Sequence, residues 1–149
     1  MYGDTELIRR RVSALRDQGA EVRALADELV ARVEGLGWTG RAADAMTERV
    51  SDRARHLRTA ASGHVAAADA LASHAEAVDL ATDDIANVEA RVTAMVADAR
   101  ARIAAIAAAN EDGRPAVTPD PTDETLAAFV APPRGHRDWL DVDVPGLER

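Results

Sequence analysis

The sequence lacks cysteine and lysine, and only 3% of its residues are aromatic. Without cysteine there are no disulfides, thiolate metal sites or cysteine nucleophiles, and without lysine there is no P-loop. No apolar run approaches the roughly 20 residues that span a bilayer. The first residues also lack the basic and apolar regions of a secretory signal peptide. We therefore expect no membrane span and no Sec-type export.

What the chain has instead is alanine, at 34 of its 149 positions, and a net charge of −8. Much alanine with few β-branched and aromatic residues favours helices over a β-sandwich or barrel. No part of the chain is basic, so a nucleic-acid partner is not expected. All six prolines follow residue 114. The composition predicts an all-α domain followed by a proline-rich tail.

A seven-residue repeat of apolar side chains predicts a first helix over residues 5–36. Its members are Ile8, Leu15, Val22, Leu29 and Leu36, with a second row at Val12, Gly19, Ala26 and Val33. Two such rows form the seam typical of helices that wind around each other. Gly19 weakens a helix interior by roughly 1 kcal/mol relative to alanine. Its place on the seam indicates that a partner backbone passes close to it.

The same repeat predicts a long second helix over residues 41–109. Its members are Val50, Leu57, His64, Leu71, Val78, Ile85, Val92, Ala99 and Ile106. A break near residue 82 stays open, because Thr82 and the two aspartates after it can cap a new helix. Between the helices, residues 37–40 predict a turn in which Gly37 or Gly40 takes a positive φ. A short turn between two seamed helices predicts an antiparallel hairpin.

The second helix continues well beyond the level where the first helix ends, so the far part of its seam needs a cover. The candidate partner interface comprises Val78, Ile85, Val88, Val92, Met95, Val96, Ile103 and Ile106. The cover is a second chain, the tail, or the segment after Thr82 folding back. Because a two-helix hairpin buries little surface alone, we expect pairing into a four-helix-bundle-like dimer. Homodimer and heterodimer both remain open.

Residues 113–149 are predicted to be a mostly extended or disordered tail, with a short helix at 121–130. Four apolar side chains are candidates for docking on the exposed seam: Leu126, Phe129, Trp139 and Leu140. Their burial nearly balances the entropy of ordering the tail. We therefore expect partial docking that a partner helix displaces.

Catalytic and metal-binding patterns are absent from the sequence. No two of the four histidines have the spacing that places metal ligands on one helix face, and no serine has a base in register. His64 lies on the seam and is expected to pack there. The sequence predicts no catalytic residue, no metal and no cofactor.

One motif is specific. Trp38-Thr39-Gly40 lies in the predicted turn and is followed by Arg41-Ala42-Ala43-Asp44-Ala45-Met46. Over roughly residues 5–80 the chain resembles the WXG family of type VII (ESX) secretion substrates. In that family a Trp-Xaa-Gly turn joins two amphipathic helices of a small four-helix-bundle dimer. The arginine and alanine bias agrees with an actinobacterial source. In this chain we expect the Trp38 ring to close the open end of the hairpin.

The resemblance implies a non-enzymatic secretion substrate or secretion partner. Such a protein pairs with itself or another WXG-like protein, contacts a secretion ATPase, and leaves the cytoplasm without a signal peptide. The only tyrosine, Tyr2, precedes the first helix, whereas many members carry a tyrosine export motif after the second. Whether this chain or its partner carries the export signal therefore stays open. The alternatives are a cytosolic coiled-coil adaptor and a stand-alone trafficking module for a toxin.

Overall fold

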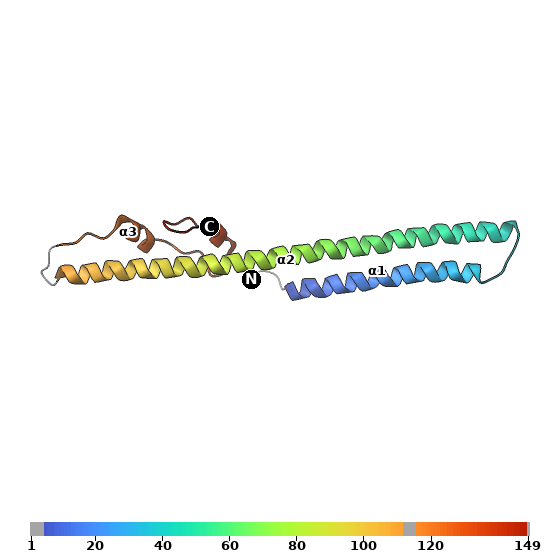
Figure 1. Cartoon of the computed structure of the whole chain (residues 1–149), viewed down its shortest axis with the longest axis horizontal. Coiled ribbons are helices and arrows are strands. Elements are labelled where there is room, and N and C mark those ends of the chain that lie inside the picture. The colour runs from blue at the N-terminus through green and yellow to red at the C-terminus, as the bar shows by residue number, and fades with distance from the viewer. Residues whose placement is uncertain (1–4, 112–115, 149) are drawn as a thin grey trace. The chain divides into compact units, whose positions relative to one another are not determined.

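The computed structural model describes residues 5–111 and 116–148, and every regular element in these ranges is helical. Helix α1 spans Thr5–Glu34, α2 spans Arg41–Glu111 and α3 spans Pro121–Ala127, followed by a 3₁₀ helix, η1, at Arg137–Asp141 (Figure 1). The predicted all-α class is confirmed for this part of the chain. Helix α1 ends two residues before its predicted end, and α2 ends two residues after it.

Helix α2 is a single helix of 71 residues. It stays helical through Thr82 and the two aspartates that follow, where the sequence left a break open. These three residues do not cap a new helix, because no proline or glycine interrupts the backbone hydrogen bonds of α2 there.

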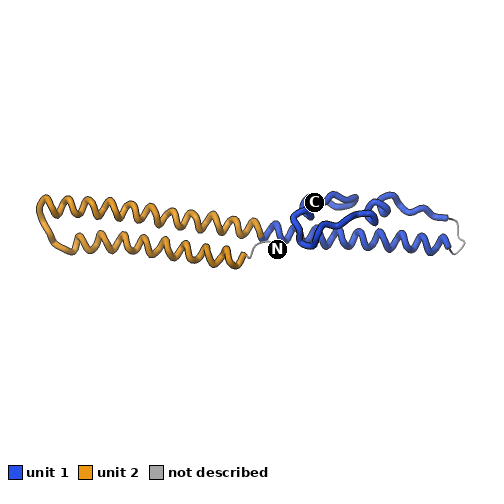
Figure 2. Tube along the Cα trace, turned by 180° about the vertical axis from the view of Figure 1, so that it is seen from behind, with its two compact units in different colours: residues 1–2, 79–149 blue, residues 3–78 orange. Residues whose placement is uncertain are grey.

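The chain divides into two compact units, one of residues 3–78 and the other of residues 1–2 and 79–149 (Figure 2). In the first unit, α1 lies against residues 41–78 of α2, and the two helices run in opposite directions. We call these two segments the helix pair. Their contact is a buried inner row at a spacing of seven: Val12, Gly19 and Ala26 on α1, and Ala54, Ala61, Ala68 and Ala75 on α2.

Small inner residues allow the two backbones to approach closely. A Cβ added at Gly19 would lie 3.1 Å from the carbonyl oxygen of Ala61 and 3.4 Å from the Cβ of His64. This confirms the close approach that the sequence predicted at Gly19. The same spacing of seven, sustained along both helices, is typical of helices that wind gently around each other.

The second unit holds the rest of α2 with residues 116–148 packed along it. Its core joins Ile85, Val92, Val96 and Ala99 of α2 to Leu126, Trp139, Val142 and Val144. Outside α3 and η1 the described tail has no regular secondary structure, and several of its apolar side chains pack against α2. The tail is held because most of its large apolar side chains pack against one seam of α2; Val117 and Val130 stay exposed. The predicted short helix forms as α3, three residues shorter than expected.

Candidate functional site

One face of the helix pair carries a continuous apolar strip. A half-buried residue lies four positions before each inner residue. Leu29 on α1 and Val78 on α2 continue the same spacing of seven by one repeat. These residues are Ile8, Leu15, Val22 and Leu29 on α1, and Val50, Leu57, His64, Leu71 and Val78 on α2. Because the helices are antiparallel, positions offset in the same sense from the inner row lie on the same face. We call this set the strip; His64 is its only polar member.

The opposite face of the helix pair is mainly polar, although Val30 and Val65 lie half-buried on it. Arg16 pairs with Asp69 at 3.0 Å, and Arg58 pairs with Asp27 at 2.7 Å, each bridging the two helices. All four side chains are well exposed, so each pair contributes modestly to stability. The helix pair therefore has one face suited to contact with water and one apolar face suited to burial against another surface.

The turn exposes its tryptophan. The Trp38 side chain is 68% exposed, so the expectation that its ring closes the end of the helix pair is wrong. Gly37 and Gly40 both have positive φ, 61° and 100°, where the sequence predicted one of them. Thr39 lies between these glycines and is exposed.

Most of the predicted partner interface lies under the tail rather than free. Ile85, Val92 and Val96 are buried in the core of the second unit, and Val88 and Met95 pack against that core. Ile103 and Ile106 are half-buried, and Val78 belongs to the strip. Of the three covers that the sequence left open, the structure contains the tail.

The predicted docking residues of the tail contact this seam to different extents. Trp139 is 2% exposed and Leu126 is also buried, whereas Phe129 and Leu140 are partly buried against the same core. The rings of Phe129 and Trp139 lie 6.3 Å apart. The indole N–H of Trp139 donates to the carbonyl of Pro133 at 3.0 Å, which satisfies its polar atom inside the core.

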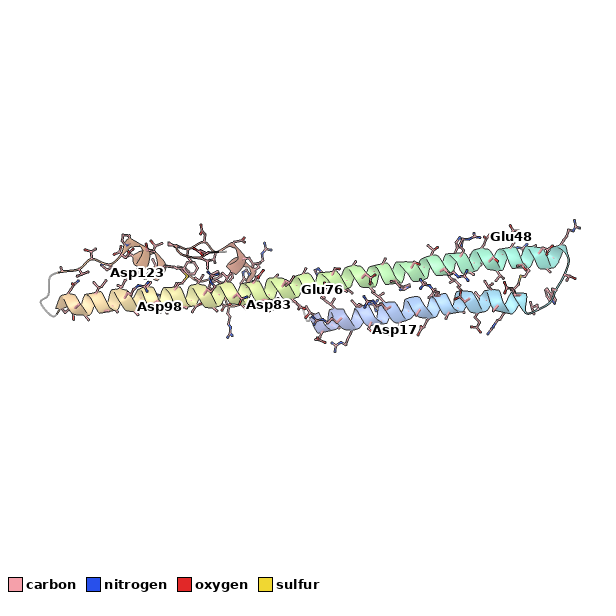
Figure 3. All side chains as sticks on the ribbon, viewed as in Figure 1. Asp17, Glu48, Glu76, Asp83, Asp98 and Asp123 are labelled. Atoms are coloured by element: carbon pink, nitrogen blue, oxygen red, sulfur yellow. The ribbon has the colours of Figure 1, made fainter. Side chains whose placement is uncertain are left out.

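Polar contacts between the tail and α2 were not foreseen. Asp123 lies on α3 (Figure 3), is 8% exposed, and accepts from Arg102 Nε at 2.9 Å and Nη2 at 2.5 Å. These hydrogen bonds hold the pKa of the Asp123 carboxyl below its usual value, against the opposing effect of desolvation. Glu89 accepts from the Gly135 N–H at 2.9 Å. Because these partners lie 21 and 46 residues apart, no local pattern signals them.

Grooves in the second unit offer little reactive chemistry. One of about 750 Å³ is lined mainly by alanine and threonine, with Glu89 as its one carboxylate. Among the described residues, no three histidines, aspartates or glutamates gather where a metal ion would bind. In the same part of the chain, no helix is long and apolar enough to cross a membrane.

Comparisons with models of known families, with curated proteins and with solved structures found no match for this chain. The resemblance to the WXG family therefore rests on the sequence pattern described above.

Proposed function

We propose that this protein acts by helix–helix pairing, as a non-enzymatic WXG-like type VII secretion substrate or secretion partner. The observation that carries the proposal is the strip, a half-buried apolar face on a helix pair whose opposite face is mainly polar. An apolar face of this extent is unusual on a surface that meets only water. A second helix pair laid on the strip completes a four-helix bundle.

The exposed Trp38 supports the same proposal. Large aromatic side chains are the commonest anchors of protein interfaces, and this ring contributes nothing to the core of its own chain. Together with Gly40 it forms the Trp-Xaa-Gly turn of the family that the sequence resembles. We infer that the ring contacts the partner or the secretion machinery.

Export from cells with and without a functional type VII system tests the proposal. We expect the wild-type chain in the medium only when the system is intact. Trp38→Ala should stay folded by circular dichroism and lose export. Leu15→Asp with Leu57→Asp should lose export too, because it places charge on the strip. The matched control, Ala20→Asp with Ala66→Asp, changes exposed positions outside the strip and should be exported.

Three outcomes would contradict this proposal. Export that does not depend on the type VII system contradicts the secretion role. Association through the strip without export indicates the cytosolic coiled-coil adaptor. Normal export of the strip variant would show that the strip has no part in the function.

A further inference from the structure

Among the residues that the structure describes, the borders of the strip carry arginine and no acidic residue. The border positions come one residue before each inner position, and also before Val33 and Thr47, which continue the inner spacing of seven toward the turn. By helical geometry they flank the strip on its outer side. On α1 they are Arg11, Gln18, Leu25 and Arg32; on α2 they are Met46, Arg53, Ala60, Ala67 and His74. Leu25 and Met46 are 49% and 41% exposed, which widens the apolar face. The remaining border side chains are those of arginine, glutamine, alanine and His74.

The border arginines differ from those on the opposite face. Among the interactions of the described residues, Arg11 and Arg53 have no acidic partner, and both are exposed. Arg32 pairs with Glu28, on its own helix. On the opposite face, Arg16 and Arg58 are both satisfied by aspartates of the other helix. Two guanidinium groups beside the strip are therefore left for a partner to pair with.

The register of the helix pair gathers these charges at the two ends of the strip. The bridges from Arg16 to Asp69 and from Arg58 to Asp27 set which positions are level with each other. By that register Arg32 lies level with Arg53 near the turn, and Arg11 lies level with His74 near the other end. Whichever way a second copy is turned, an end that bears arginine meets another end that bears arginine.

We propose that the occupant of the strip is a different helical protein, whose own apolar face is bordered by aspartate or glutamate. This rests on the proposed function, which makes the strip a pairing surface, and it specifies the partner. Complementary charge at the rim of an interface selects the partner and its orientation, whereas like charge disfavours the wrong one. Self-pairing is thereby weakened and is strengthened by salt, which screens the repulsion.

A copy of this chain with acidic borders serves as the probe. The full-length variant Arg11→Glu with Arg53→Glu reverses one border charge at each end and breaks no ion pair among the described residues. The matched control, Arg41→Glu with Arg49→Glu, makes the same charge change at exposed positions away from the strip. Labelled wild type is titrated with unlabelled wild type, variant or control.

We expect the wild type to bind the acidic-border variant about tenfold more tightly than it binds itself at low salt. The advantage should vanish at about 500 mM salt, where the Debye length is only a few ångströms. The control should bind like the wild type. Equal affinity for wild type and variant would overturn the proposal while leaving the strip a pairing surface.

Two further outcomes are decisive. Binding of the wild type, but not the acidic-border variant, to phosphatidylserine vesicles would show that the borders recognise a lipid surface, and would overturn the proposal. If no mixture associates, and the Leu15→Asp with Leu57→Asp variant is exported normally, the strip is not a pairing surface. In that case the proposed function fails together with the partner inferred from it.

Discussion

Gly19 and Gly63 both lie within helices of the first unit, and together they test how closely the two helices of the helix pair approach each other. At Gly19 an added Cβ would lie 3.1 Å from the Ala61 carbonyl oxygen and 3.3 Å from Cγ2 of Val65. At Gly63 an added Cβ would meet nothing within 4 Å. Gly19→Ala and Gly63→Ala are thus the same substitution with and without a neighbouring helix in the way.

The expected magnitudes follow from two opposing effects. Replacing glycine by alanine inside a helix gains about 1 kcal/mol. Gly63→Ala should raise the free energy of unfolding by that amount. At Gly19 the nearest atom is a backbone oxygen, which cannot rotate away, and overpacking typically costs about 1–3 kcal/mol. Gly19→Ala should therefore range from neutral to about 2 kcal/mol destabilising, which places the two variants about 1–3 kcal/mol apart.

Urea unfolding followed by far-UV circular dichroism measures this difference. All three proteins are compared at one concentration, because association shifts apparent stability. The dependence of the unfolding free energy on urea should be unchanged, so that midpoints report stability alone. If Gly19→Ala stabilised the protein as much as Gly63→Ala, the helices would not be in close contact at this level, and the reasoning would be refuted.

The remaining predictions concern the turn and the tail. Trp38→Ala should change the free energy of unfolding by less than about 0.5 kcal/mol, as for an exposed residue; a loss of several kcal/mol in urea unfolding would show that the ring is buried. Trp139→Ala should destabilise the second unit by about 3 kcal/mol or more. Limited proteolysis should then cleave within residues 116–148. If these residues stayed resistant to the protease, Trp139 would not be the residue that holds the tail on α2. The Asp123 pKa is lowered in the folded chain, so its pairing with Arg102 stabilises the docked tail above the ordinary carboxyl pKa and is lost as pH falls through the lower, folded pKa. In a Trp38→Phe background, Trp139 emission should shift to the red below about pH 4, and Asp123→Asn should remove that dependence; an unchanged transition would assign it to another group. Deleting residues 114–149 uncovers Ile85 and Val92 and should strengthen self-association in light scattering, and an unchanged mass would argue against the tail as their cover.

The agreement between sequence and structure is greatest where the signal is local. The chain has no proline before residue 115, and three of its glycines lie within residues 35–40. These two features predicted the ends of the two long helices to within two residues. The place of Gly19 on the seam indicated the close backbone approach, because glycine adds no side chain between two backbones that nearly touch. These features depend on neighbours along one helix, or on a single spacing that repeats.

The candidate site was predicted less completely. The sequence placed the pairing surface on the far part of α2, whereas the structure covers Ile85, Val92 and Val96 with the tail and leaves the strip half-exposed. The apolar members of the strip were recognised as a seam, but the seam was expected to be filled by the first helix. Alanine and glycine in the inner row fill it instead, so the larger side chains are displaced to one face.

The sequence by itself determined that the chain is helical, where its long helices begin and end, and which positions repeat at seven. Those properties follow from backbone hydrogen bonding and side-chain spacing within about two turns. Only the tertiary structure decided that Trp38 is exposed, that the tail has a defined place, and that Asp123 pairs with Arg102. Each of these depends on how closely two segments approach and on which groups meet across 21 or more residues. These contacts are determined by packing volume and by loop closure, neither of which a local sequence pattern shows.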